Sequence, residues 1–157
     1  MRARGIIESG GGKVMNAVLV STDWVQEHLS DSSIRLIEVD VDTTAYEQGH
    51  IPGAIGLNWQ TQLQDPVRRD IPSKELLETT LGALGVSDTH TIVLYGDNNN
   101  WFAAFAFWVL KIYGHEDVRI MDGGRKKWLA EGRVTTTDVP NYPPMQYRAK
   151  EPDFSLR

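Results

Sequence analysis

The stretch YEQGHIPGAIGL, residues Tyr46–Leu57, decides how the rest of this 157-residue chain is arranged. Gly49 allows a positive φ, and Pro52-Gly53 is a strong turn-forming dipeptide. His50 lies between these two breaks, where its imidazole can bond to nearby backbone groups and hold the loop. The apolar residues after the turn predict a short buried strand. The stretch therefore predicts a rigid loop that leads the chain into a sheet.

The composition is that of one soluble, compact domain with a hydrophobic core. Hydrophobic residues make up 41% of the chain and charged residues 24%, and the net charge of −5 argues against nucleic acid or an anionic membrane as a partner. The short basic runs Arg68-Arg69 and 125–127 are interpreted as solvated surface. There is no cysteine, which excludes disulfides, thiolate metal sites and thiol catalysis within the chain and fits a cytoplasmic protein.

Periodicity and capping residues predict strands that alternate with helices. We expect a disordered leader at 1–14, a domain at 15–133, and a proline-rich extended tail at 134–157 that adds nothing to the core. Within the domain the expected strands are 17–20, 34–39, a short one ending the Tyr46–Leu57 stretch, 91–95 and 118–121. Two of the expected helices begin after capping residues, Ser21 and Ser73, and two more span 101–113 and 125–131.

This order predicts an α/β fold, a sandwich around a mainly parallel sheet of about five strands. The run TIVLY at 91–95 is apolar throughout, as expected for a parallel strand covered on both faces. Ligand sites in such folds lie beyond the carboxyl ends of the strands. The two loops to inspect are therefore Asp40–Thr44 and Gly96–Asn100.

The opening stretch also resembles the first signature of the rhodanese family. The match is carried by Tyr46, His50, Pro52, Gly53 and Ala54, each at its expected spacing, with aliphatic residues at the remaining specified positions. The resemblance implies a rhodanese-like three-layer sandwich. In that family the motif supports the fold and carries no chemistry, so we expect His50 to be structural.

An active rhodanese domain places its nucleophilic cysteine after the strand that here ends at Tyr95. The residue at that position is Gly96, followed by Asp97, so the resemblance implies no catalytic residue in this chain. We expect Asp97 to have a structural role, in which a carboxylate in this loop accepts N–H groups that would otherwise hold an anion. The later run from Met121 to Trp128 resembles the family's closing glycine-glycine and aromatic motif, with departures at Arg125 and Lys127.

These departures resemble the inactive N-terminal domain of a tandem sulfurtransferase. The implied function is to shape the active site of a C-terminal domain, with the tail as interdomain linker. Thiosulfate and an acceptor such as cyanide would be the substrates, 3-mercaptopyruvate the other donor, and no cofactor or metal is implied. In tandem rhodaneses the inactive domain lends aromatic residues to its partner's active-site wall, and Trp101 and Phe102 resemble those.

Two other interpretations stay open. Asp40-Val41-Asp42-Thr43-Thr44 fits the D-x-D-x-T motif of haloacid-dehalogenase-like phosphatases, which use an aspartyl nucleophile and Mg²⁺. The later acidic motif of those enzymes lacks its second carboxylate here. Alternatively, the chain is a stand-alone rhodanese-like module that binds a partner; the length of the full reading frame distinguishes this from a tandem enzyme.

Overall fold

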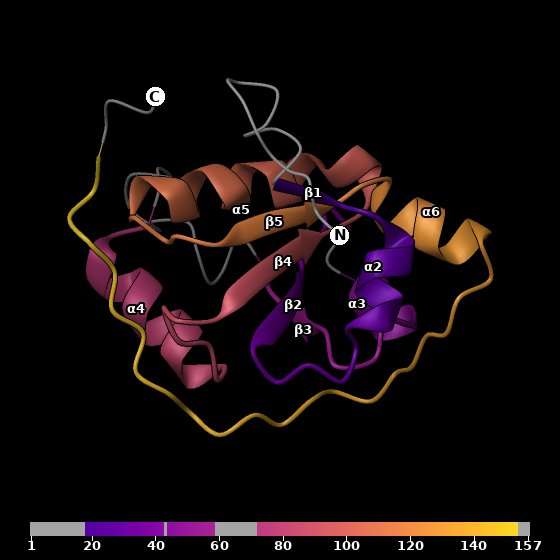
Figure 1. Ribbon diagram of the computed structural model, residues 1–157, viewed down its shortest axis with the longest axis horizontal. Coiled ribbons are helices and arrows are strands. Elements are labelled where there is room, and N and C mark those ends of the chain that lie inside the picture. Colours follow the sequence, from indigo (N-terminus) through magenta and orange to yellow (C-terminus); the bar gives the residue numbers. More distant parts are fainter. Residues whose placement is uncertain (1–17, 43, 59–71, 154–157) are drawn as a thin grey trace.

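A computed structural model of the chain describes residues 18–42, 44–58 and 72–153, and the structural findings below concern these residues. Its strands form one sheet in which every pairing is parallel (Figure 1). The strand order is β1-β5-β4-β2-β3. The predicted parallel sheet of about five strands is confirmed, with strands β1 (Leu19–Val20), β2 (Ile34–Glu38), β3 (Ile55–Gly56), β4 (Thr91–Tyr95) and β5 (Val118–Met121).

Helices cover both faces of this sheet, so the predicted three-layer sandwich is confirmed. Helices α4 and α5 pack on one face, where Leu77 and Val109 belong to the larger core cluster. Helices α2 and α6 cover the other face, where Val25 and Trp128 belong to a second cluster. The helices are α2 (Thr22–Glu27), α3 (Ala45–Gln48), α4 (Lys74–Ala83), the 3-10 turn η2 (Asn98–Asn100), α5 (Trp101–Ile112) and α6 (Gly124–Ala130).

None of the described helices has the length and apolar character needed to cross a membrane.

The predicted capping residues begin their helices. The Ser21 hydroxyl accepts a hydrogen bond from the Trp24 amide, and the Ser73 hydroxyl accepts one from the Leu76 amide. Helix α2 ends at Glu27, earlier than the apolar spacing to Leu29 suggests. The other helix boundaries fall within one residue of the prediction, because caps and glycines fix them locally.

The two central strands determine where the candidate site lies. Strands β2 and β4 pair in register from Ile34 opposite Thr91 to Glu38 opposite Tyr95. Their carboxyl ends are therefore side by side, and the loops that follow them meet at one edge of the sheet.

Residues 134–153, which we call the strap, run from α6 around the domain to α4 (Figure 1). The strap holds no described helix and joins the domain through a bridge between Thr136 and His50. Tyr147, at 3% exposure, and Ala149 are buried in the larger core cluster. The prediction that this segment adds nothing to the core is therefore wrong. The sequence did not indicate these two core residues, because isolated core side chains on an extended chain leave no periodic pattern. The predicted leader at 1–14, Ala17 and the run Arg68-Arg69 lie outside the described residues.

Candidate functional site

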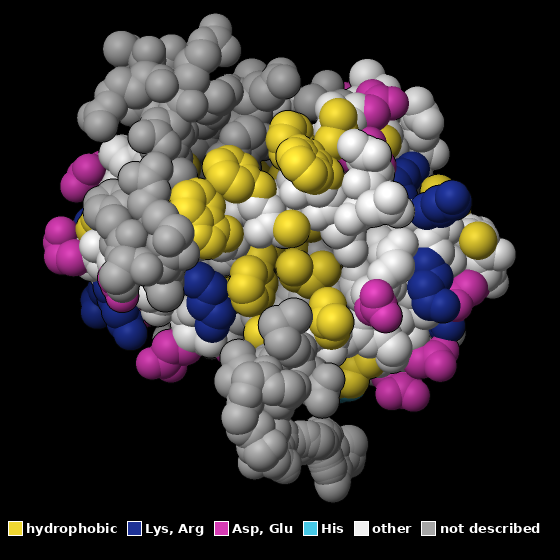
Figure 2. All heavy atoms as spheres, turned by 90° about the horizontal axis from the view of Figure 1, so that it is seen from above, with side chains coloured by type: hydrophobic (Ala, Val, Ile, Leu, Met, Phe, Trp, Pro, Cys, Tyr) yellow, Lys and Arg dark blue, Asp and Glu magenta, His cyan; other side chains and the backbone are white. Residues whose placement is uncertain are grey.

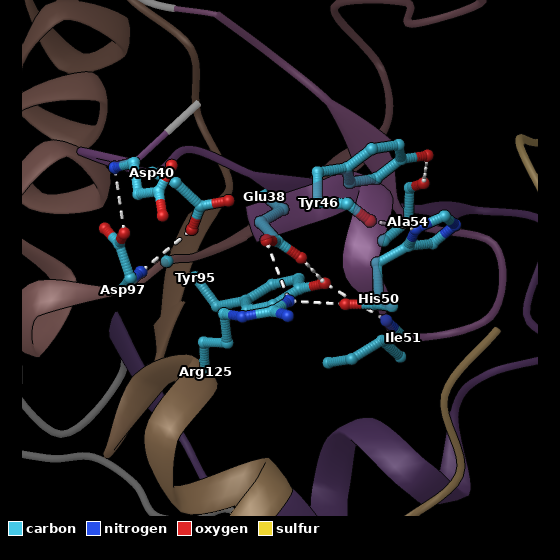
Figure 3. A network of polar contacts seen from close by, with 12 residues as sticks. Glu38, Asp40, Tyr46, His50, Ile51, Ala54, Tyr95, Asp97 and Arg125 are labelled. Atoms are coloured by element: carbon cyan, nitrogen blue, oxygen red, sulfur yellow. Dashed lines mark hydrogen bonds and ion pairs between the residues drawn. The ribbon is translucent and has the colours of Figure 1, made fainter. Parts of the chain in front are cut away.

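The loops after β2 and β4 contact each other through two aspartates. The Asp97 carboxylate accepts hydrogen bonds from the amides of Val41 and Asp42, at 2.6 and 2.9 Å. In return, the Asp97 amide donates to the Asp40 carboxyl group at 2.9 Å. Asp97 therefore accepts backbone N–H groups, as predicted, although these come from the facing loop and not from its own. Figure 3 shows both aspartates between the two loops.

The amide and the carbonyl of Gly96 are both hydrogen-bonded, the carbonyl by the Arg125 amide. The Gly96 amide donates to the side-chain oxygen of Asn100 at 2.9 Å, and the Asn100 side-chain amide donates to the Met121 carbonyl at 2.8 Å. Asn98, Asn99 and Asn100 all have positive φ, between 50 and 62°, a region that is costly for residues other than glycine. The Asn100 bonds offset part of that cost and hold the loop in this shape.

The backbone also leaves no room for a side chain at Gly96. A Cβ atom built there would lie 2.0 Å from the Val39 carbonyl oxygen, which is backbone and cannot move aside on its own. The position that corresponds to the family's cysteine is therefore closed by the backbone of Val39, the residue after β2. The amide N–H groups of Gly96 and Asp97 are also occupied, by the side chains of Asn100 and Asp40.

Behind these loops lies a buried ionic network that the sequence did not reveal (Figure 3). Glu38, 1% exposed at the end of β2, accepts a hydrogen bond of 2.5 Å from the Tyr95 hydroxyl and one of 3.0 Å from Arg125. Arg125 also donates to the Gly49 carbonyl, which joins α6 to the loop before His50. The interpretation of Arg125 as solvated surface is therefore wrong. Charge alone does not tell a paired arginine from a solvated one.

Burial strongly perturbs the ionisable groups of this network. Asp40 has its pKa raised to about 9, first by burial and then by its hydrogen bond and charge repulsion with Glu38. The pKa of Tyr95 is raised well above its usual value, mainly by burial and by the Glu38 charge. Burial and the repulsion from Glu38 therefore favour the protonated form of Asp40 at this end of the sheet. Among the described residues, no group of three or more His, Cys, Asp or Glu side chains is arranged to hold a metal ion.

The motif around His50 holds the edge of the sheet. The His50 ring, 1% exposed, stacks on Tyr46 with centroids 3.8 Å apart and bonds through Nδ1 to the Tyr46 carbonyl at 2.9 Å. Its Nε2 bonds to the Asp138 carbonyl of the strap at 2.6 Å. The Tyr46 hydroxyl donates to the Ala54 carbonyl at 2.6 Å, across the Pro52-Gly53 turn. The predicted bonding of His50 to nearby backbone is confirmed, and the partner on the strap is new.

The two aromatic residues at the start of α5 differ in exposure. Trp101 is 66% exposed, whereas Phe102 is partly buried against the larger core cluster. The exposed Trp101 follows directly from the Gly96–Asn100 loop, at the carboxyl end of β4. This end of the sheet therefore combines three features: the Gly96–Asn100 loop, which has no room for a side chain at Gly96, the buried network around Glu38, and the exposed indole ring of Trp101.

Comparison with known proteins matches residues 21–131 to the rhodanese-like domain family. The chain is 54% identical over 140 residues to a "Putative thiosulfate sulfurtransferase" of Saccharopolyspora erythraea and 55% identical over 140 residues to "Sulfur carrier protein TtuD" of Thermus thermophilus. Each alignment covers 89% of this chain but about half of the relative, 50% and 49%. Among solved structures, the fold is similar to the 3-mercaptopyruvate sulfotransferase SseA of Escherichia coli, with a TM-score of 0.77, 25% identity, and coverage of 85% of this chain and 55% of SseA.

Proposed function

The chain belongs to the rhodanese-like domain family, and we propose that it is the cysteine-free N-terminal domain of a tandem thiosulfate or 3-mercaptopyruvate sulfurtransferase. The observation that carries the proposal is the Gly96 position, which has no thiol and no room for a side chain. Sulfur transfer through a persulfide needs a thiolate, and this chain has no cysteine. The match to about half the length of each relative leaves room for a second domain that supplies the nucleophile. A cytoplasmic location is part of the same proposal.

In this proposal the domain shapes the wall of its partner's active site through the start of α5. Trp101 is two-thirds exposed at the ligand end of the fold, and a large exposed aromatic side chain typically marks a contact surface. Figure 2, which looks onto the molecule from the α5 side of Figure 1, shows hydrophobic side chains gathered across the middle of that face. Phe102 contributes less to such a wall, since it already packs against its own core.

The aspartyl-phosphatase interpretation gains no support from this geometry. The Asp97 carboxylate is held by two backbone amides, and the rhodanese match extends across Asp40–Thr44. That alternative requires Mg²⁺-dependent phosphatase activity, whereas our proposal requires none.

The test is a sulfurtransferase assay of the full reading frame beside the 157-residue chain, with thiosulfate and with 3-mercaptopyruvate as donors and cyanide as acceptor. We expect turnover only from the longer protein and none from the chain alone. The Gly96→Cys variant of the chain should also be inactive, because the side chain would meet the Val39 carbonyl.

Two outcomes would contradict the proposal. One is persulfide-dependent turnover by the purified chain. The other is a reading frame without a second, cysteine-containing rhodanese domain, which would favour the stand-alone binding module.

A further inference from the structure

A cavity lies away from the strand carboxyl ends, between α2, the start of β2 and the Pro52-Gly53 turn. Its volume is ≈ 320 Å³, within the lower range of small-molecule sites. Buried apolar side chains from both central strands and from α2 line it, namely Leu36, Val93 and Val25. The proposed sulfurtransferase function uses none of these residues.

One wall of this cavity is aromatic. Trp24 and His28, one turn apart on the chain, stack with ring centroids 4.0 Å apart and an interplanar angle of 21°. The His28 Nδ1 atom bonds to the Trp24 carbonyl at 2.6 Å, which fixes the imidazole against the indole. A flat aromatic wall beside an apolar floor favours a ligand with a ring or a compact hydrocarbon body.

The cavity is also lined by a buried arginine without an acidic partner. Arg35 is only 8% exposed, and its guanidinium donates to the carbonyls of Gly85, Ser32 and Ile34. No carboxylate of the described chain forms an ion pair with it. The guanidinium carbon also lies 4.0 Å from the centroid of the Tyr142 ring of the strap, and Tyr142 lines the same cavity. Buried charges are normally paired, so this site has a cation without a counter-ion.

We propose that this cavity binds a small organic acid, with its carboxylate at Arg35 and its apolar body against Trp24 and Leu36. Asp31 also lines the cavity, but it forms no ion pair with Arg35, and its Oδ1 accepts from the Ser33 amide and hydroxyl at 2.9 and 2.7 Å. Nε and Nη1 of Arg35 donate to backbone carbonyls, so the carboxylate would accept from the remaining Nη2 group through charge-assisted hydrogen bonds. The inference stands independently of the proposed sulfurtransferase role.

The test uses three probes of matched size: phenylacetate, 2-phenylethanol and 2-phenylethylamine. Each is titrated into the ¹⁵N-labelled 157-residue chain while the Trp24 indole N–H signal is followed by NMR. We expect saturable shifts, with phenylacetate bound about tenfold more tightly than the alcohol and the amine weakest. Nuclear Overhauser contacts should link the phenylacetate ring to the Leu36 and Val93 methyl groups.

Three variants test the effect of the Arg35 charge on binding separately from the effect of access to the cavity. Arg35→Met should abolish the preference for phenylacetate over the alcohol, whereas Lys111→Met, a matched loss of charge outside the cavity, should preserve it. Ser32→Phe places a ring at the exposed rim, keeps the Ser32 carbonyl that accepts from Arg35, and should block all three probes. It also covers the case in which Arg35→Met fails to fold. Phenylacetate bound no more tightly than the alcohol, absent contacts to Leu36 and Val93, or unchanged binding to Ser32→Phe would each overturn the proposal.

Discussion

At the scale of single residues, Asp40 makes the stability of this domain depend on pH. Its pKa of about 9 in the folded state, against roughly 3.9 in an unfolded chain, means that unfolding releases a proton between these values, so stability falls as pH rises from about 4 to about 9. We predict that Asp40→Asn stabilises the chain at pH 8 by about 2 kcal/mol and little at pH 5, because the amide cannot ionise yet still accepts from Asp97. Urea unfolding at both pH values measures this. The exposed Asp42→Asn, whose carboxylate has a lowered pKa, is the control and should give no such gain. A gain for Asp40→Asn that does not grow with pH would contradict the assignment.

At the scale of elements, the strap is an integral part of the domain although it has no helix or strand. Its Tyr147 hydroxyl bonds to His115 Nδ1 at 2.7 Å, its Met145 amide bonds to the Gly82 carbonyl, and its Lys150 amide to that of Tyr113. We predict that Tyr147→Ala lowers the free energy of unfolding by about 3 kcal/mol, because it empties a core position and leaves Nδ1 of the buried His115 without its partner. Val139→Ala in the same strap, at a position exposed to solvent, should change it by less than about 0.5 kcal/mol. Equal effects of the two substitutions in urea unfolding would show that the strap is a loose tail.

At the scale of the whole molecule, the proposed role as one domain of a tandem enzyme depends on the exposed start of α5. If Trp101 packs on a second domain, the 157-residue chain exposes a surface that is normally covered. We therefore predict that the chain self-associates and that Trp101→Ser makes it more monomeric with little loss of stability. Analytical ultracentrifugation over a range of concentrations measures this, with Leu129→Ser, a change of another exposed apolar residue on α6, as the control. In the full-length protein, Trp101→Ser should lower sulfurtransferase activity. Unchanged association of the variant, or an unaffected enzyme, would count against the interface.

Much of the fold could be predicted because its signals are local. The apolar run of β4, the caps at Ser21 and Ser73, and the turn after His50 each act through neighbours in the chain. Parallel pairing then follows from the alternation of strands and helices, and the two loops worth inspecting follow from the strand ends. The resemblance to rhodaneses and the lack of a thiol at Gly96 also came from the sequence alone.

Only the tertiary structure decided the partners of buried polar groups. Glu38 and Arg125 are 87 positions apart, and no local pattern pairs them. The same holds for Asp97 with the loop after β2, for Tyr147 within the core, and for Arg35, which has no carboxylate partner among the described residues. Local sequence determined where the chain turns and which runs are buried, because capping and burial depend on side-chain type. Which charges meet depends on packing across the sheet, and this packing also places the Val39 carbonyl where a side chain at Gly96 would have to lie.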